Sequence, residues 1–437
     1  MASELREDEQ VRRGIEEVLK ESEEYAKRLL EVDADKVVIV HHDDADGVAA
    51  GALLKLALEE RFSTHLVCLE KTYPQIVKKL QAQGKEPIIY VDLGSPHAPL
   101  ISKLNELKRT IIIVDHHDLE LKGEIGEEVM ILNPEMHGVD GGTYACGASL
   151  AYFFARSIKR GMERYGGLAV IGSVEIPGEP RGLNLLALGE AVKAGVAVYD
   201  EKDEKAKVLW DGKFMKPEAL STKLTVMASV GYYQGGPQKA LESCTRCSWI
   251  GVEDLLSSLE EKRKRAYSNV ISRLRYTGLN KLRRVQWFHV EDQFHDMGVK
   301  VIGTFCSYLM HQRIVDDDKV LVGMMNMRSE VPGLGALEGS YVKVSARAPK
   351  KVLTLIEAGS LEPLSKALAE AAKRLSGFGD GHAAAASGIV PKGREREFVE
   401  LMDKLLAKGE RGPEERVEKR GREVTLEKFL FPKKVEK

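Results

Sequence analysis

Long apolar runs, cysteine and aromatic side chains are all scarce in this sequence of 437 residues. No apolar run approaches the roughly 20 residues that a membrane-spanning helix needs. The charged, helix-periodic start at residues 1–30 lacks the apolar core of a signal peptide. We therefore expect no membrane association and a cytoplasmic location. The five cysteines, an odd number in a large chain, argue against a disulfide framework.

The sequence also has few cysteine pairs, little net charge and few aromatic residues, which bears on metal and nucleic-acid binding. Only Cys244 and Cys247 have metal or redox spacing, and no second ligand pair lies nearby, so we interpret them as structural or incidental thiols. The net charge of −2 does not by itself indicate a nucleic-acid-binding protein, although a local basic face is enough for binding. Aromatic residues make up 6% of the chain, which limits base stacking to a few positions, with Phe378 as one candidate.

Apolar runs that alternate with helical segments predict a parallel sheet in the first half of the chain. The runs 37–40, 87–91 and 111–114 are rich in β-branched residues, and helix-forming stretches separate them. Such alternation is typical of an α/β domain. In these domains ligands bind at the carboxyl ends of the strands.

The second half of the chain predicts a long helix and a second α/β domain. Residues 251–284 are charged and lack proline, which favours an exposed linking helix. Strands are expected at Val299–Ile302, Val320–Met327 and Tyr341–Ala346, and a Gly-rich loop is expected at Gly377–His382. The length also favours two or three domains, of which we assume two.

The expected organisation has four parts. They are a catalytic domain with an N-terminal helix at 1–250, the linking helix at 251–284, a smaller α/β domain at 285–408 and a charged tail at 409–437.

The strongest chemical signal follows the first predicted strand. His42, Asp44 and Asp46 alternate there, and Gly47 frees the turn. In an extended segment this alternation would place the three side chains on one side. Carboxylates mixed with imidazole suit manganese, or magnesium less well.

Two further polar clusters follow the next strands. Asp92 precedes Leu93 and Gly94, and Asp115 precedes His116 and His117. A single aspartate at the end of a strand is commonly a helix cap. Three such clusters at one sheet edge instead predict a metal site, because a structural protein would gain nothing from this concentration of charge.

These residues resemble the first three motifs of the DHH phosphoesterase superfamily. Asn133-Pro134 and the stretch that begins at Cys146 resemble the segment that follows in RecJ-type members. The stretch from Gly379 to Gly388, together with Ser345 and Arg347, resembles the signature of the DHH-associated C-terminal domain. The resemblance covers roughly residues 35–400.

The resemblance implies an N-terminal DHH domain and two manganese ions, with magnesium as an alternative. His42 and Asp44 would bind one ion and Asp46 and His116 the other, while Asp92 would bridge them. His117 would face the phosphate. We therefore expect Asp92, Asp115 and His117 to be catalytic.

One motif departs from the family pattern. The fourth motif usually supplies an aspartate a few residues after a glycine, and the corresponding stretch here contains Glu175 instead. Glu175 is either a longer carboxylate ligand or a loop residue that never meets the metal.

The DHH-associated signature predicts a substrate-binding surface in the second domain. A Gly-rich loop lets backbone amides approach a phosphate, and basic side chains add charge-assisted hydrogen bonds. The residues that we expect to bind substrate are Ser345, Arg347, Gly379, Gly381 and His382.

Residues 423–431 resemble the short peptide that docks replication enzymes on the sliding clamp. Leu426, Phe429 and Phe431 would form its apolar plug, and Glu423 stands where glutamine is usual. The alternative is a helix that packs on the body of the protein.

The resemblance implies a single-strand-specific exonuclease of DNA repair or replication, similar to archaeal RecJ-like enzymes. The form of the fourth motif favours the branch associated with the Hef helicase–nuclease, with 3′ to 5′ polarity, over the branch associated with GINS. Two alternatives are a phosphodiesterase for small nucleotides and a non-catalytic replication scaffold similar to Cdc45. Preference for DNA or RNA and homo-oligomer formation stay open.

Overall fold

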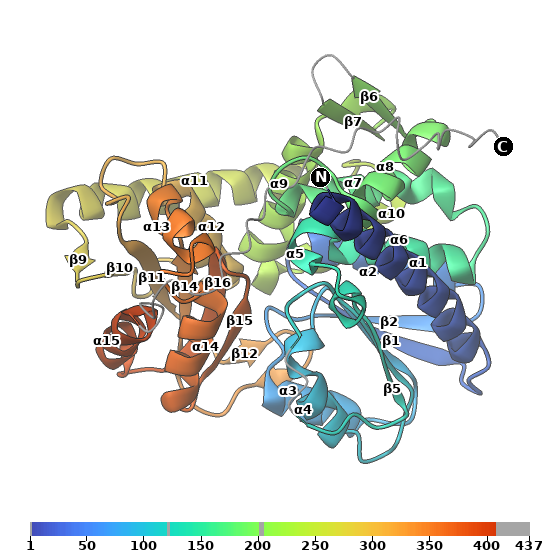
Figure 1. The fold of residues 1–437 in the computed structure, drawn as a ribbon, viewed down its shortest axis with the longest axis horizontal. Helices are drawn as coiled ribbons and strands as arrows, with labels where there is room; N and C mark the ends of the chain where they lie inside the picture. Colours follow the sequence, from blue (N-terminus) through green and yellow to red (C-terminus); the bar gives the residue numbers. More distant parts are fainter. Residues whose placement is uncertain (1, 120–122, 201–204, 408–437) are drawn as a thin grey trace. The chain divides into compact units, whose positions relative to one another are not determined.

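The computed structural model describes residues 2–119, 123–200 and 205–407 (Figure 1). These residues form two compact units. Among the described residues, the first unit spans 2–228 and 235–256, and the second spans 229–234 and 257–407. The tail at 409–437, including the predicted peptide with Leu426, Phe429 and Phe431, lies outside the described residues.

A five-stranded parallel sheet forms the centre of the first unit, with strand order β2-β1-β3-β4-β5. The strands are β1 (Lys36–His41), β2 (Ser63–Cys68), β3 (Ile88–Val91), β4 (Ile111–Val114) and β5 (Val129–Leu132). Every residue of β3, β4 and β5 is buried, as expected for parallel strands covered on both faces. The three predicted strands are confirmed, while β2 and β5 were not predicted.

Helices cover this sheet. Helix α2 (Ala45–Leu58) is buried along almost its whole length, because α6 (Gly147–Ile158) and α7 (Gly166–Gly172) pack against it. Helix α1 (Ala2–Leu30) lies along α6 (Figure 1). The other α-helices of this unit are α3 (Pro74–Gln81), α4 (Ala98–Lys103), α5 (Gly141–Tyr144), α8 (Gly182–Lys193), α9 (Pro217–Thr225) and α10 (Gly236–Arg246).

A small antiparallel sheet interrupts the helices of the first unit. It contains β6 (Ala197–Asp200), β7 (Lys205–Trp210) and β8 (Lys213–Met215), none of which was predicted. A π-helical turn then spans Val226–Val230, where the chain passes from the first unit into the second.

The second unit contains a mixed six-stranded sheet with strand order β15-β16-β14-β11-β10-β9. The strands are β9 (Asn280–Lys281), β10 (Val285–His289), β11 (Val320–Asn326), β14 (Tyr341–Arg347), β15 (Phe378–Gly381) and β16 (Ala385–Pro391). Helices α13 (Lys350–Glu357), α14 (Leu364–Arg374) and α15 (Glu395–Leu406) share a core with β10, β11, β14 and β16. Helix α12 (Lys300–Leu309) packs on β11 and β14, and a short hairpin joins β12 (Glu330–Val331) to β13 (Gly335–Ala336).

Helix α11 (Glu253–Thr277) lies within the segment 251–284, for which a linking helix was predicted. It ends before residue 284, because Gly278 adopts a positive φ of 72° and residues 280–281 pair with β10. With this helix and the two sheets, the predicted α/β fold class is confirmed.

Two local predictions in the second unit were wrong. Val299–Ile302 was expected to be a strand but belongs to the start of α12, where Val301, Ile302 and Phe305 follow helical spacing and are buried. The expected Gly-rich loop is largely strand β15, which pairs with β16. Glycine is needed there because a Cβ on Gly379 would lie 2.3 Å from Leu368 Cδ2 of the packed helix α14.

Candidate metal centre

The first cluster is built by the turn from β1 into α2. His42 follows the strand, Asp44 is the N-cap of α2, and Asp46 lies in the first helical turn. The Gly47 amide donates to Asp44 Oδ1 at 2.9 Å, while Asp44 Oδ2 lies 2.7 Å from Nδ1 of His42. The expected extended alternation was therefore wrong, because the helix begins between Asp44 and Asp46.

Asp92 lies at the end of β3, between the other two clusters. Its Oδ2 is 3.7 Å from Nδ1 of His42, and its Oδ1 is 3.4 Å from Nε2 of His116. Its backbone has a positive φ of 61°, a conformation that is costly for a non-glycine residue. Strain of this kind is concentrated at functional sites, and no feature of the sequence indicates it.

Asp115 organises the turn after β4. Its carboxylate accepts hydrogen bonds from the Ser95 and His116 amides, both at 2.8 Å, and from Nδ1 of His117 at 2.7 Å. Burial would raise the pKa of Asp115, but its charge and hydrogen-bond interactions with His117, aided by His116 and Ser95, hold that pKa well below its ordinary value. Asp115 is therefore ionised in the folded protein.

Asp46 caps a second helix from a distance in sequence. The amide of Gly147 donates to Oδ2 at 2.8 Å and the amide of Ala148 donates to Oδ1, both at the start of α6. Oδ2 also lies 3.7 Å from Nε2 of His116. A Cβ on Gly172 would lie 2.4 Å from Oδ1 of Asp46, so a larger residue there would displace the carboxylate.

The carboxylates disfavour one another's ionised forms. Burial raises the pKa of Asp92 well above its ordinary value, and the charges of Asp46, Asp44, Asp115 and Glu175 raise it further. Burial and the charge of Asp44 also raise the pKa of Asp46, although the α6 amides oppose this effect. A cation placed among these groups would instead lower the pKa of these carboxyl groups.

Two groups of ligand atoms lie close enough to hold a metal ion within the described part of the first unit. One contains His42, Asp44 and Asp92, and the other contains Asp92, Asp115, His116 and His117. The ligand atoms in each group lie within 4.8 Å of one another. Asp92 is common to both, and its buried Oδ1 accepts no hydrogen bond from the described residues. The donor set fits divalent ions that prefer oxygen and imidazole.

Two predicted ligands lie outside these groups. The oxygens of Asp46 accept hydrogen bonds from the amides at the start of α6. Glu175 is exposed and ends a short 3₁₀ turn (Ser173–Glu175), although its charge still raises the pKa of Asp92.

The predicted substrate-binding residues belong to the second unit. Nη1 of Arg347 donates to Ser345 Oγ and its Nε donates to Ser307 Oγ, each at 3.0 Å. Gly379 and Gly381 lie in β15. The backbone of His382 continues this pairing through its amide, which donates to the Ala385 carbonyl at 2.8 Å.

The thiol pair contains no disulfide. Cys244 and Cys247 are free, and burial raises the pKa of each thiol. Neither thiol belongs to a ligand group in the described ranges, which leaves the interpretation as structural thiols in place.

Two supporting residues, Ser95 and Thr225, were missed by sequence reasoning, and the sequence did not indicate the contacts of Asn133. Asn133 donates to the His117 carbonyl at 3.0 Å and to Ser95 Oγ at 2.9 Å, which fixes the turn around Asp115. Thr225 Oγ1 accepts from the Ala45 amide at 3.1 Å, between two predicted ligands. Thr225 lies 180 residues from this turn, so no local pattern could have indicated it.

Residues 36–173 match the model of the DHH family, N-terminal domain. An uncharacterized protein of Methanocaldococcus jannaschii is 25% identical over 468 residues, which cover 93% of this chain and 99% of the relative. Among described residues, no helix is long and apolar enough to cross a membrane.

Solved structures show a similar fold. RecJ from Thermus thermophilus, in complex with Mn²⁺, superposes with a TM-score of 0.60 and 14% identity, covering 89% of this chain and 55% of that one. A PF0399 DHH domain structure gives a TM-score of 0.58 and 17% identity, covering 93% and 98%. Cdc45 from Entamoeba histolytica gives 0.50 and 10%, covering 90% and 98%. Residues 36–173 thus match the DHH family, N-terminal domain, and the fold of the chain is similar to that of RecJ and of Cdc45.

Proposed function

We propose that this chain is a metal-dependent phosphodiesterase that shortens single-stranded nucleic acid from one end, with 3′ to 5′ polarity. The observation that carries the proposal is the position of Asp92. It is shared by both ligand groups, and its buried Oδ1 lacks a hydrogen-bond donor within the described residues. A carboxylate shared by two ligand groups could hold both ions of a two-metal phosphodiesterase site.

In this proposal His42 and Asp44 would hold one ion, Asp46 and His116 would hold the other, and Asp92 would contribute to both. Manganese is the proposed metal and magnesium the alternative, in keeping with RecJ structures that contain Mn²⁺ or Mg²⁺. Bound divalent ions would polarise the phosphate and supply hydroxide at neutral pH. Glu175 is the proposed additional carboxylate, in place of the usual fourth-motif aspartate.

His117 is the proposed contact to the scissile phosphate. Because Nδ1 of His117 donates to Asp115 at 2.7 Å, the Asp115 carboxylate fixes the orientation of the ring. Nε2 is the second polar atom of the ring and can donate to a phosphate oxygen when the ring is protonated. Asp115 thus acts through His117, and its low pKa keeps it able to accept the hydrogen bond.

The second unit is proposed to bind the nucleic-acid strand. Arg347 is oriented by Ser345 and Ser307, which leaves its guanidinium in a fixed position for a phosphate. The other proposed contacts are the amides of Gly379 and Gly381 and the side chain of His382.

The tail is the proposed partner-binding segment. Leu426, Phe429 and Phe431 would occupy the apolar site of a sliding clamp, and Hef or GINS would be a further replication partner. We expect deletion of residues 423–437 to abolish clamp binding in calorimetry without slowing hydrolysis of short oligonucleotides. Retained clamp binding would contradict the assignment of the peptide.

The test of activity is a time course with Mn²⁺ on DNA and RNA oligonucleotides labelled at either end. A ladder that shortens from the 3′ end would support the proposal. Cleavage only of phosphoadenosine phosphate or cyclic dinucleotides would indicate a small-nucleotide phosphodiesterase. Cleavage of no substrate would favour a scaffold, as the Cdc45-like fold allows.

A further inference from the structure

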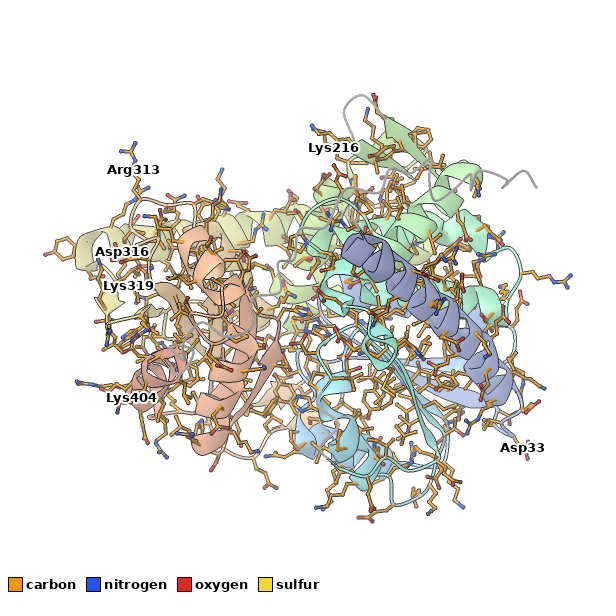
Figure 2. The ribbon with its side chains drawn as sticks, in the orientation of Figure 1. Asp33, Lys216, Arg313, Asp316, Lys319 and Lys404 are labelled. Carbon is orange, nitrogen blue, oxygen red and sulfur yellow. The ribbon has the colours of Figure 1, made fainter. Side chains whose placement is uncertain are left out.

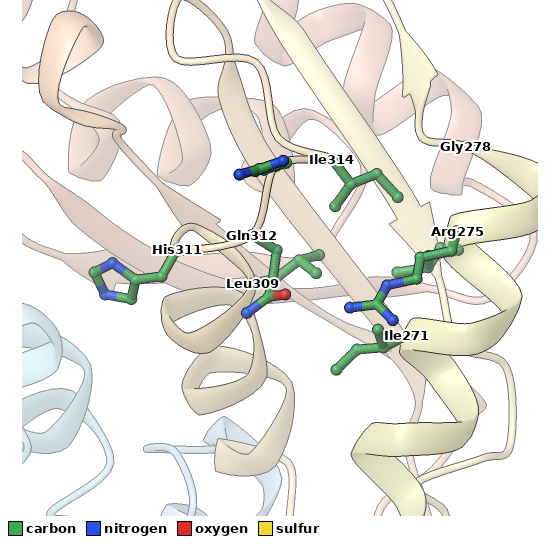
Figure 3. A pocket seen from close by; sticks show the side chains of 9 residues that line it. Ile271, Arg275, Gly278, Leu309, His311, Gln312 and Ile314 are labelled. Carbon is green, nitrogen blue, oxygen red and sulfur yellow. The ribbon is translucent and has the colours of Figure 1, made fainter.

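The second unit contains a pocket of about 560 Å³ between the end of α11 and the segment that follows α12 (Figure 3). Its lining residues are Ile271, Leu274, Arg275, Gly278, Leu309, His311, Gln312, Arg313 and Ile314. This volume lies within the range of small-molecule sites. None of the predicted substrate-binding residues lines it.

The lining combines an aliphatic surface with cationic groups. Leu274 and Leu309 are buried, and Ile271 and Ile314 are partly buried beside them. Arg275 and Arg313 are exposed, and Figure 2 shows Arg313 extending from the surface. No lining residue is acidic, although the chain has 67 acidic residues against 65 Lys and Arg. The composition therefore favours an anion with an apolar part.

The two arginines differ from other surface arginines of this unit. Arg265, Arg374 and Arg396 each form an ion pair with a glutamate four residues earlier or later. Arg275 has Ile271 at the corresponding position and Arg313 is outside a helix, and in the described structure neither has an ion-pair partner. Their guanidinium groups therefore stay available for an external anion.

The pocket also contains a charged and a neutral polar side chain, those of Arg275 and Gln312. Figure 3 shows the side chains of Arg275 and Gln312 pointing toward one another across the pocket. A guanidinium binds phosphate oxygens in a bidentate manner, and a glutamine amide has both donors and an acceptor for a base edge. The aliphatic side chains of Ile271, Leu309 and Ile314, which also line the pocket, offer a surface for the face of a base.

We propose that this pocket binds one nucleotide, with its phosphate at Arg275 and Arg313 and its base beside Gln312 and the aliphatic surface. The ligand is a nucleoside phosphate, either free or as one unit of a single strand. The choice of ligand rests on the proposed function, while the pocket lies in the second unit and its residues are separate from the metal ligands.

The test measures binding with EDTA present, so that hydrolysis does not enter. Isothermal titration with adenosine monophosphate, and fluorescence anisotropy with a labelled oligonucleotide, would be compared for the intact chain and the double variant Arg275→Ala/Arg313→Ala. We expect the variant to lose affinity by about tenfold or more, since two charge-assisted phosphate contacts disappear. The control, Lys264→Ala/Arg265→Ala, removes the same charge from exposed positions of α11 and keeps wild-type affinity.

A second variant, Gln312→Glu, places a carboxylate in the pocket and is also expected to weaken binding. Weakened binding of the monophosphate would identify a site for free nucleotides, and weakening of the oligonucleotide alone would identify a strand contact. Unchanged affinity in both pocket variants, or an equal loss in the control, would overturn the proposal. Hydrolysis by the intact chain with Mn²⁺ is scored separately, so failure of the catalytic proposal is distinguishable.

Discussion

Oδ1 of Asp92 lies 3.4 Å from Nε2 of His116, and both groups are buried at the ends of neighbouring strands. The distance is too long for a strong hydrogen bond. The two atoms thus face one another as two ligands would across an ion. The strength of metal binding should therefore depend on the residues that hold these two side chains and the turns beside them.

Asp92→Asn is expected to abolish metal-dependent cleavage, with a loss on the order of a thousandfold, because an amide is a poor bridge between two cations. The same change is expected to stabilise the metal-free protein by about 1 kcal/mol, since it removes a carboxyl group whose ionised form is disfavoured by burial and by the neighbouring carboxylates. Urea unfolding in EDTA and Mn²⁺ titration would measure the two effects. Asp33→Asn, at an exposed position, is the control and should alter neither.

Thr225→Val is expected to lower Mn²⁺ affinity about tenfold while Thr225→Ser keeps it, because only the hydroxyl can accept the hydrogen bond from Ala45. Calorimetry with Mn²⁺ would measure affinity, and thermal unfolding in EDTA would report any general loss of stability. If the Ser and Val variants bound Mn²⁺ equally, Thr225 would have no role in positioning the turn.

Because His41 is buried, we expect the folded protein to lose stability in acid. Burial lowers the pKa of His41 from 6.5 to about 4, so the unfolded chain takes up a proton before the folded protein does. The stabilisation is complete above pH 6.5 and is lost as the pH falls toward 4. At pH 5 the loss amounts to about 2 kcal/mol relative to neutral pH.

Urea unfolding at pH 7.5 and pH 5, in EDTA, would measure this effect. In His41→Gln the free energy of unfolding is expected to fall by about 2 kcal/mol less between pH 7.5 and pH 5 than in the wild type. His65→Gln, at an exposed position, should show the same fall as the wild type. An identical pH dependence in the two variants would contradict the assignment to His41.

Arg347→Ala is expected to weaken binding of a single strand by about tenfold and to flatten the dependence of affinity on salt. The reason is that loss of a phosphate contact releases fewer counterions. Anisotropy measured at several salt concentrations would provide the slope. Lys350→Ala, at an exposed position nearby in sequence, is the control, and an unchanged slope for Arg347→Ala would show that Arg347 touches no phosphate.

The sequence predicted the α/β fold class and three strands of the first sheet, but not the contacts that hold the polar residues at the ends of those strands. The β-branched runs at β1, β3 and β4 indicated adjacent parallel strands, and the polar residues after them do converge. The positive φ of Asp92 and the Thr225 contact depend on tertiary packing, so no periodic pattern reports them. The Gly-rich segment at 377–382 was misread because Gly379 makes room for Leu368 of α14, and Gly377 and Gly381 make room for the backbone of β16, within a strand pairing.

The strand order of the first sheet also has a consequence for folding. Strands β1, β3 and β4 are neighbours in that order, and each brings one polar cluster to the edge. Parallel neighbours pair only after the crossover between them has closed, which makes their assembly slow compared with local helix formation. A spectroscopic signal from Mn²⁺ would then appear only once β1, β3 and β4 were paired in register. In stopped-flow refolding with the metal present, the rate at which this signal appears would report the rate of sheet assembly.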